Sequence, residues 1–138
     1  EARLAAGMET ILVAIHSFTP IYKDVARPWP IGLIPGEDER FTRGLQRALT
    51  EDAPELDVGW NQPYAGGKGV TYTLEQHGDG RDLPATMIEI RHDEILEGPG
   101  IMLWAGRLAR TLERARESLA KESATGVVPV AKPGVLDN

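Results

Sequence analysis

The chain has 138 residues, of which 41% are hydrophobic and 26% charged, and its formal net charge is −6 at pH 7. These values fit one folded domain with a hydrophobic core and exclude a largely disordered chain. The negative charge argues against binding to nucleic acid or to an anionic membrane surface, because both require a basic face. No apolar run approaches the roughly 20 residues that a membrane-spanning helix needs.

The chain contains no cysteine. Any bound metal must therefore be coordinated by His, Asp or Glu, and no disulfide framework is possible. This composition, without a signal-peptide pattern, fits a cytoplasmic protein. Residues 1–7 resemble the end of a helix that is capped by Gly7. A segment in the middle of a domain begins in this way, so we expect the chain to be part of a longer protein.

The first half of the chain alternates between strands and helices. We predict a strand over residues 10–17, and its five consecutive aliphatic residues (11–15) indicate burial on both faces. A loop over 18–30 follows, with three prolines. Next come a short strand over 31–34, a helix from Asp38 to about residue 51, and a third strand over 56–60.

The second half continues this alternation. We predict a short helix over 72–77, a strand over 84–90, a break at Gly98-Pro99-Gly100, and a long helix over about 101–121. Residues 1–122 then belong to one α/β domain, and Ser123–Asn138 form an extended tail. The order of elements predicts an α/β fold with a mostly parallel or mixed sheet.

Three of the predicted strands carry polar side chains at or just beyond their ends. These side chains are His16 with Ser17, Asn61 with Tyr64, and Glu89 with Arg91. Ligands of open α/β sheets bind in the crevice outside the carboxyl ends of the strands. These three strand ends are therefore the candidate site.

Glu89 is unusual because it lies within an apolar strand. Strand alternation places Glu89 and Arg91 on the same face, and a buried carboxylate costs several kcal/mol unless it is paired or used. One interpretation is a structural Glu89–Arg91 ion pair. The other is a general base beside a guanidinium group that holds a substrate carboxylate. The residues alone leave both open.

His16 also allows two interpretations, a hydrogen-bonded core histidine or a zinc ligand. A hydrolytic zinc centre needs about three protein ligands and one open position for water. His77 and His92 are the other histidines, and neither has an obvious place beside His16. The chain therefore does not supply a complete metal site by itself.

Beyond Phe18, the loop over 18–30 carries two cations and two aromatic side chains, namely Tyr22, Lys23, Arg27 and Trp29. Such a loop could line a pocket for an anion. An ordinary surface loop with its aromatic side chains packed down is the simpler interpretation, and the loop by itself favours it.

Taken together, these segments resemble the N-formylglutamate amidohydrolase family. The similarity runs in order over about residues 10–115, and it consists of Ala14-Ile-His16-Ser-Phe-Thr-Pro20, Tyr22-Lys23, Ala26-Arg27-Pro-Trp29, Asn61-Gln-Pro-Tyr64-Ala-Gly66, Tyr72-Thr-Leu and Ile88-Glu89-Ile-Arg91. Each motif alone is weak, whereas the ordered series is specific.

The resemblance implies a three-layer α/β/α sandwich of the phosphorylase/hydrolase-like type. It also implies zinc-dependent hydrolysis of N-formyl-L-glutamate to formate and L-glutamate, a step of histidine degradation. His16 matches a zinc ligand of the family, and Glu89 matches the general base that acts on the zinc-bound water. The residues that would hold the substrate are Arg91, Arg27, Asn61, Tyr64 and Ser17.

The chain also departs from the family pattern. Members are roughly twice as long, and their N-terminal half carries further zinc ligands that have no counterpart here. We therefore expect this chain to supply the C-terminal half of an active site whose partner is the N-terminal half of the same protein. Hydrolysis of another N-acyl amino acid and a metal-free binding module of the same fold are the alternatives.

Overall fold

A computed structural model describes residues 1–67 and 69–125. Four strands form a mixed sheet in the order β1-β6-β4-β5. They are β1 (Leu12–Phe18), β4 (Ile31–Pro35), β5 (Val58–Trp60) and β6 (Ala85–Arg91). The β1–β6 and β4–β5 pairs are parallel, and the β4–β6 pair is antiparallel. The predicted α/β fold with a mixed sheet is confirmed.

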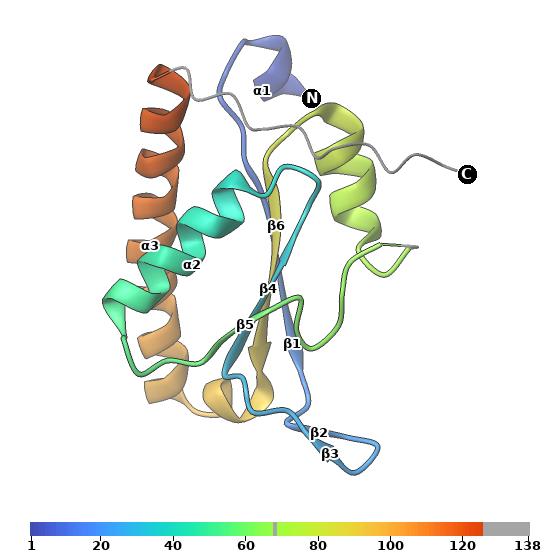
Figure 1. The fold of residues 1–138 in the computed structure, drawn as a ribbon, viewed down its shortest axis with the longest axis vertical. Helices are drawn as coiled ribbons and strands as arrows, with labels where there is room; N and C mark the ends of the chain where they lie inside the picture. Colours follow the sequence, from blue (N-terminus) through green and yellow to red (C-terminus); the bar gives the residue numbers. More distant parts are fainter. Residues whose placement is uncertain (68, 126–138) are drawn as a thin grey trace, which may run out of the picture.

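Helices lie on both sides of this sheet (Figure 1). Helices α2 (Arg40–Asp52) and α3 (Gly98–Ala124) cover one face. The other face carries η1 (Leu74–Gly78), a π-helical turn, and the 3₁₀ turn η2 (Asp79–Arg81). A second 3₁₀ turn, η3 (His92–Ile95), leads from β6 towards α3. The short helix α1 (Ala2–Ala5) ends before Gly7, whose φ of +69° confirms the predicted glycine at the end of a helix.

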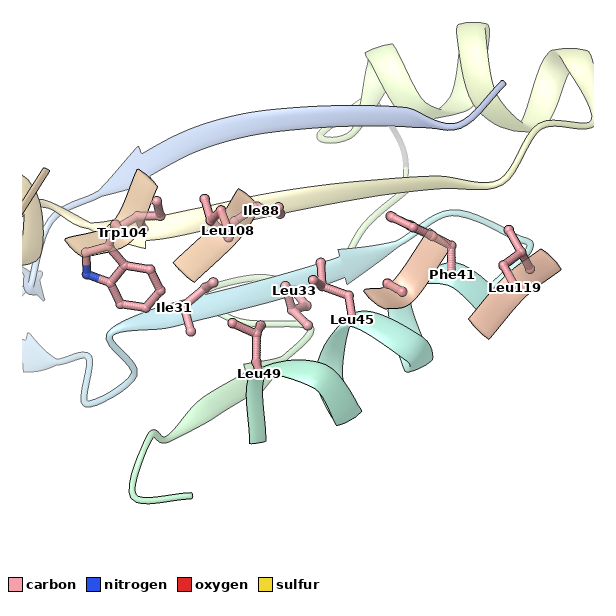
Figure 2. Packing of buried hydrophobic residues seen from close by; sticks show 11 residues of the cluster. Ile31, Leu33, Phe41, Leu45, Leu49, Ile88, Trp104, Leu108 and Leu119 are labelled. Carbon is pink, nitrogen blue, oxygen red and sulfur yellow. The ribbon is translucent and has the colours of Figure 1, made fainter. Parts of the chain in front are cut away.

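The main core lies between the sheet and the α2–α3 layer (Figure 2). Alternate residues of β4 and β6 point into it, and the side chains of both helices fill it from the other side. Its central members include Ile31, Leu33, Ile88, Leu45, Leu49, Trp104 and Leu108. A smaller cluster on the opposite face joins η1 to the sheet through Leu74, Ile34, Ala85 and Met87.

Strand β1 is an edge strand, and this corrects the prediction that residues 11–15 are buried on both faces. Leu12, Val13 and Ala14 are only half-buried, and Ile15 is 57% exposed. In the described part of the chain β1 pairs on one side only, with β6. An aliphatic run is typical of an interior strand. The exposure of this run therefore marks the edge of the sheet where no further described segment packs against β1.

Helix α3 begins earlier than predicted, so Gly98-Pro99-Gly100 is its first turn and not a break. Proline is accepted there because the first helical N–H groups have no partner within the helix. Gly100 is required by packing, because a Cβ at this position would lie 2.2 Å from the carbonyl oxygen of Glu94. The predicted tail is wrong at its start, since Ser123 belongs to α3. Its remainder, 126–138, lies outside the described residues.

The loop over 18–30 contains a small hairpin that the sequence did not predict. Strands β2 (Ile21–Tyr22) and β3 (Val25–Ala26) pair in antiparallel fashion. Lys23 and Asp24 form the turn with φ values of 48° and 62°. Two consecutive positive φ values match the strand twist of a two-residue hairpin turn. The hairpin lies at the end of the sheet where β1 finishes (Figure 1).

None of the helices in the described part of the chain is long and apolar enough to cross a membrane.

We expect Leu45→Ala to lower the free energy of unfolding by about 2–5 kcal/mol, because it leaves a cavity between α2 and the sheet. Leu45 is fully buried in the main core. Leu96→Ala is the matched control, since Leu96 is 75% exposed and should change stability by less than about 0.5 kcal/mol. Urea unfolding followed by circular dichroism measures both. Equal effects would contradict the described core.

Candidate active site

One row of residues crosses the whole sheet. His16 on β1 pairs with Glu89 on β6, Glu89 pairs with Gly32 on β4, and Gly32 pairs with Gly59 on β5. Ile88 and Ile90 point into the α2–α3 core, so alternation directs Glu89 to the other face. The row therefore places one imidazole and one carboxylate side by side, next to two positions without side chains.

The two glycines of this row make room for a loop. A Cβ on Gly32 would lie 1.7 Å from the carbonyl oxygen of Gln62, and a Cβ on Gly59 would lie 2.7 Å from the Cβ of Gln62. The loop turns sharply at Asn61, whose φ is 54°, and continues through a cis Gln62–Pro63 bond. The Asn61 N–H donates to the Leu33 carbonyl at 2.8 Å. The loop therefore lies directly on the glycine half of the row.

This loop delivers Tyr64 to Glu89. The Tyr64 hydroxyl donates a hydrogen bond to Oε1 of Glu89. Glu89 is only 1% exposed, whereas Tyr64 is 36% exposed, so Tyr64 is the solvent side of this pair. Burial and then the hydrogen bond to the carboxylate raise the pKa of Tyr64 to about 12. A neutral hydroxyl is thus held on the buried carboxylate.

Arg91 does not pair with Glu89 in the structure. Its Nε donates to Asp93 at 2.6 Å, and its Nη1 donates to the carbonyls of Arg27 and Pro28 at 3.0 and 2.8 Å. The hydrogen bond to Asp93 also raises the pKa of Arg91. These contacts fix the end of the 18–30 loop against β6. The Glu89–Arg91 ion pair is therefore wrong for the described chain, and the guanidinium group is already occupied by protein acceptors.

His16 lies at the open side of the row. It is exposed, and it makes no hydrogen bond or ion pair within the described part of the chain. No group of three His, Asp or Glu side chains that could hold a metal ion occurs among residues 1–67 and 69–125. The described residues therefore place one exposed imidazole beside the buried Glu89 carboxylate, and they contain no complete metal site.

Ser17 is not brought to this face. It pairs in register with Ile90, which points into the core on the α2–α3 side. Alternation along β1 therefore separates Ser17 from His16, although both are exposed. The predicted substrate contact of Ser17 is not supported by this placement. Asn61 stays beside the row as the first residue of the loop.

The Arg27 guanidinium group stacks on Phe18, which lies two residues after His16 on β1 and so on the same face of the sheet as His16. Its guanidinium carbon is 4.7 Å from the centre of the Tyr22 ring and 5.7 Å from that of Phe18. Burial raises the pKa of Tyr64, and the positive charge of Arg27 partly opposes that rise. Within the described part of the chain, Arg3 and Arg27 are the arginines that lack a carboxylate at ion-pair distance. Arg27 is therefore a charged group of the site that remains available.

Sequence reasoning found Glu89, His16 and Tyr64 but missed the glycines that bring them together. Gly32 and Gly59 lie within short apolar strands, where glycine weakens packing unless another backbone approaches closely. That signal was present in Ile31-Gly-Leu-Ile34. What it could not show was the identity of the approaching segment, which is separated from Gly32 by the whole of α2.

We expect Gly32→Ala to destabilise the protein by about 3 kcal/mol or more, because the new Cβ collides with the backbone of Gln62. Gly98→Ala is the matched control, since a Cβ there meets nothing within 4 Å and α3 gains a better helix former. Urea denaturation measures both variants. A Gly32→Ala protein as stable as the control would contradict the close contact described here.

The Tyr64 hydroxyl should titrate at about pH 12 instead of 10.0. Because the folded state holds this proton more tightly, its contribution to stability is complete below pH 10 and disappears as the pH rises through 12. The difference between phenolate absorbance titrations of the wild type and Tyr64→Phe isolates this group. A difference curve with its midpoint near 10 would show that Tyr64 does not contact the carboxylate.

Comparison with known proteins identifies a family for this chain. The family model described as N-formylglutamate amidohydrolase matches residues 1–96, which include the whole row from His16 to Glu89. None of the curated proteins compared with the chain matches it significantly.

Among solved structures, a gene product from Agrobacterium tumefaciens is similar, with a TM-score of 0.75 and 35% sequence identity. The match covers 88% of this chain and 46% of that one, so the chain spans about half the length of this relative. With a family match over most of its length and a site on the matched residues, the chain belongs to the N-formylglutamate amidohydrolase family.

Proposed function

We propose that this chain forms the C-terminal half of the active site of a zinc-dependent amide hydrolase that cleaves N-formyl-L-glutamate to formate and L-glutamate. The observation that carries the proposal is the register of β1 and β6, which places His16 and Glu89 in adjacent positions on one face. Membership of the family supports an amidohydrolase reaction. The metal, the substrate and its place in histidine degradation are parts of the proposal.

The residues present fit one side of a zinc site. His16 is exposed and has no partner among the described residues, so a ring nitrogen is available to a metal. Imidazole is a common zinc ligand, and a hydrolytic centre needs about two more protein ligands. Zinc bound there would polarise the amide carbonyl and lower the pKa of a coordinated water.

Glu89 is the proposed general base. Tyr64 occupies Oε1, which leaves Oε2 to accept a proton from the attacking water and to return it to the leaving nitrogen. The hydrogen bond from Tyr64 fixes the position of this carboxylate without bringing a charged partner to it. Because Tyr64 covers the pair from one side, the substrate would approach from the β1 side, where His16 is exposed.

Substrate binding is assigned to the polar groups around this row. A dicarboxylate such as N-formylglutamate needs cationic partners. Arg91 is paired with Asp93, whereas Arg27 has no carboxylate partner among the described residues. Asn61 offers a side-chain amide beside the row. Arg91 donates a hydrogen bond to the backbone carbonyl of Arg27, so its effect on the substrate would be indirect. Another N-acyl amino acid is the alternative substrate, and a panel of such amides would distinguish them.

The rest of the site is proposed to come from another part of the same protein. The chain spans about half of its structural relative, and β1 is an edge strand with an exposed aliphatic side chain at Ile15. A strand has unpaired N–H and C=O groups along a free edge. We propose that the N-terminal half pairs with β1 there and brings the remaining zinc ligands to His16.

Glu89→Gln should lower kcat for N-formyl-L-glutamate by about 10²–10⁴-fold, because the amide cannot accept the proton. The full-length protein that carries this sequence is assayed for formate release, with metal content measured in the same samples. Zinc should remain bound. Full activity in this variant would remove Glu89 from the role of base.

His16→Ala is the complementary control in the same experiment, and it should lose zinc together with activity. The metal analysis also tests the alternative of a metal-free binding module. A wild-type protein without stoichiometric zinc and without hydrolysis of any N-acyl amino acid would favour that module.

A further inference from the structure

The β2–β3 hairpin takes no part in the proposed reaction, but it contacts Arg27, a proposed substrate-binding residue. Arg27 follows β3 directly, and its backbone is fixed at both ends. Its N–H donates to the Pro20 carbonyl at 2.8 Å, and its own carbonyl accepts from Arg91 at 3.0 Å. The start of the Arg27 side chain is therefore held by the sheet, through β6.

The guanidinium group lies over two aromatic rings, one buried and one exposed. Phe18 is 5% exposed and belongs to β1, whereas Tyr22 is 53% exposed and belongs to the hairpin. A cation within about 6 Å of a ring centre is attracted to it. Neither ring neutralises the charge, so the side chain is oriented while it stays available to an anion.

Other polar contacts of this group are weak. Arg27 Nη1 donates to the carbonyl and the hydroxyl of Thr19, both at 3.4 Å. By contrast, Arg91 lies on the same side of the sheet and is bound by Asp93 and by two backbone carbonyls. Arg91 therefore fixes the loop over 18–30 to β6, whereas the Arg27 guanidinium group remains available to bind an anion.

We propose that Tyr22 is a positioning residue that sets the specificity for a substrate carboxylate, by orienting the Arg27 guanidinium group towards the Tyr64–Glu89 pair. This inference rests on the proposed function, which supplies the substrate. Tyr22 would confer the preference for a substrate with an acidic side chain. Tyr22 does not touch the reacting atoms and acts through Arg27. A free arginine would sample many rotamers, and stacking on two rings reduces the entropy lost on binding.

The experiment compares Tyr22→Ala with Tyr22→Phe in the full-length protein. Tyr22→Ala removes the ring and should raise KM for N-formyl-L-glutamate by about 3- to 10-fold with kcat nearly unchanged. It should also lower the preference for N-formyl-L-glutamate over N-formyl-L-glutamine, which has an uncharged side chain of the same shape. Tyr22→Phe keeps the ring and should behave like the wild type.

Two further variants distinguish a loss of Arg27 orientation from a general disruption of the β2–β3 hairpin. Val25→Ala alters the residue that pairs with Tyr22, is 66% exposed, and should leave KM unchanged. Arg27→Ala should raise KM at least as much as Tyr22→Ala, and the double variant should be no worse than Arg27→Ala alone, because both changes remove one interaction. Additive effects of the two changes would overturn the inference.

Binding of glutarate, measured by calorimetry, keeps this test independent of turnover. The Kd of the Tyr22→Ala variant should rise by the same factor as its KM. If the wild type binds glutarate but hydrolyses no N-formyl-L-glutamate, the proposed function fails and the role of Tyr22 is still decided by these Kd values. A Tyr22→Ala variant with wild-type Kd, or a wild type that does not bind glutarate, overturns the role of Tyr22.

Discussion

The contact between the Tyr64 hydroxyl and the buried Glu89 carboxylate is the interaction on which the site depends. A carboxylate that is 1% exposed is costly unless it is paired. Here the partner is a neutral donor and not a cation. The Tyr64 hydroxyl therefore holds the carboxylate in place without adding a positive charge beside it. A guanidinium partner would have bound the same oxygens through charge-assisted hydrogen bonds.

Two glycines in the sheet make this contact possible, because they leave room for the loop that carries Tyr64. Gly32 and Gly59 follow Glu89 along the row, and the 61–64 loop lies where their Cβ atoms would be. The face that carries α2 and α3 is filled with aliphatic side chains. One face of the sheet thus carries the main core, and the other accommodates the loop that brings Tyr64 to Glu89.

The edge position of β1 explains why His16 is exposed. His16 is exposed because the described chain places no further strand beside β1. The same openness would allow another part of the protein to bring ligands to the imidazole. The aliphatic run of β1 agrees with this interpretation, because such residues are typical of strands that are covered on both sides. The exposure of Ile15 and the exposure of His16 then have one cause.

The sequence by itself determined the elements that depend on local pattern. The strands at β1, β4, β5 and β6, the two main helices and the polar strand ends at His16, Asn61 and Glu89 all follow from apolar periodicity and its interruption. It also determined the family, because an ordered series of weak motifs is specific when taken together. The start of α3 was missed, since a Gly-Pro-Gly segment reads as a break although proline fits a first helical turn.

Only the tertiary structure decided which polar groups meet. Residues two apart on a strand share a face, which suggested a Glu89–Arg91 pair, but Arg91 lies at the strand end, where loop carbonyls and Asp93 compete for it. Tyr64 reaches Glu89 through a loop whose path depends on two distant glycines. The exposure of β1 depends on strand order, which local patterns do not encode. Contacts between segments far apart in sequence are set by packing, and for that reason the site could be located from the sequence but not assembled.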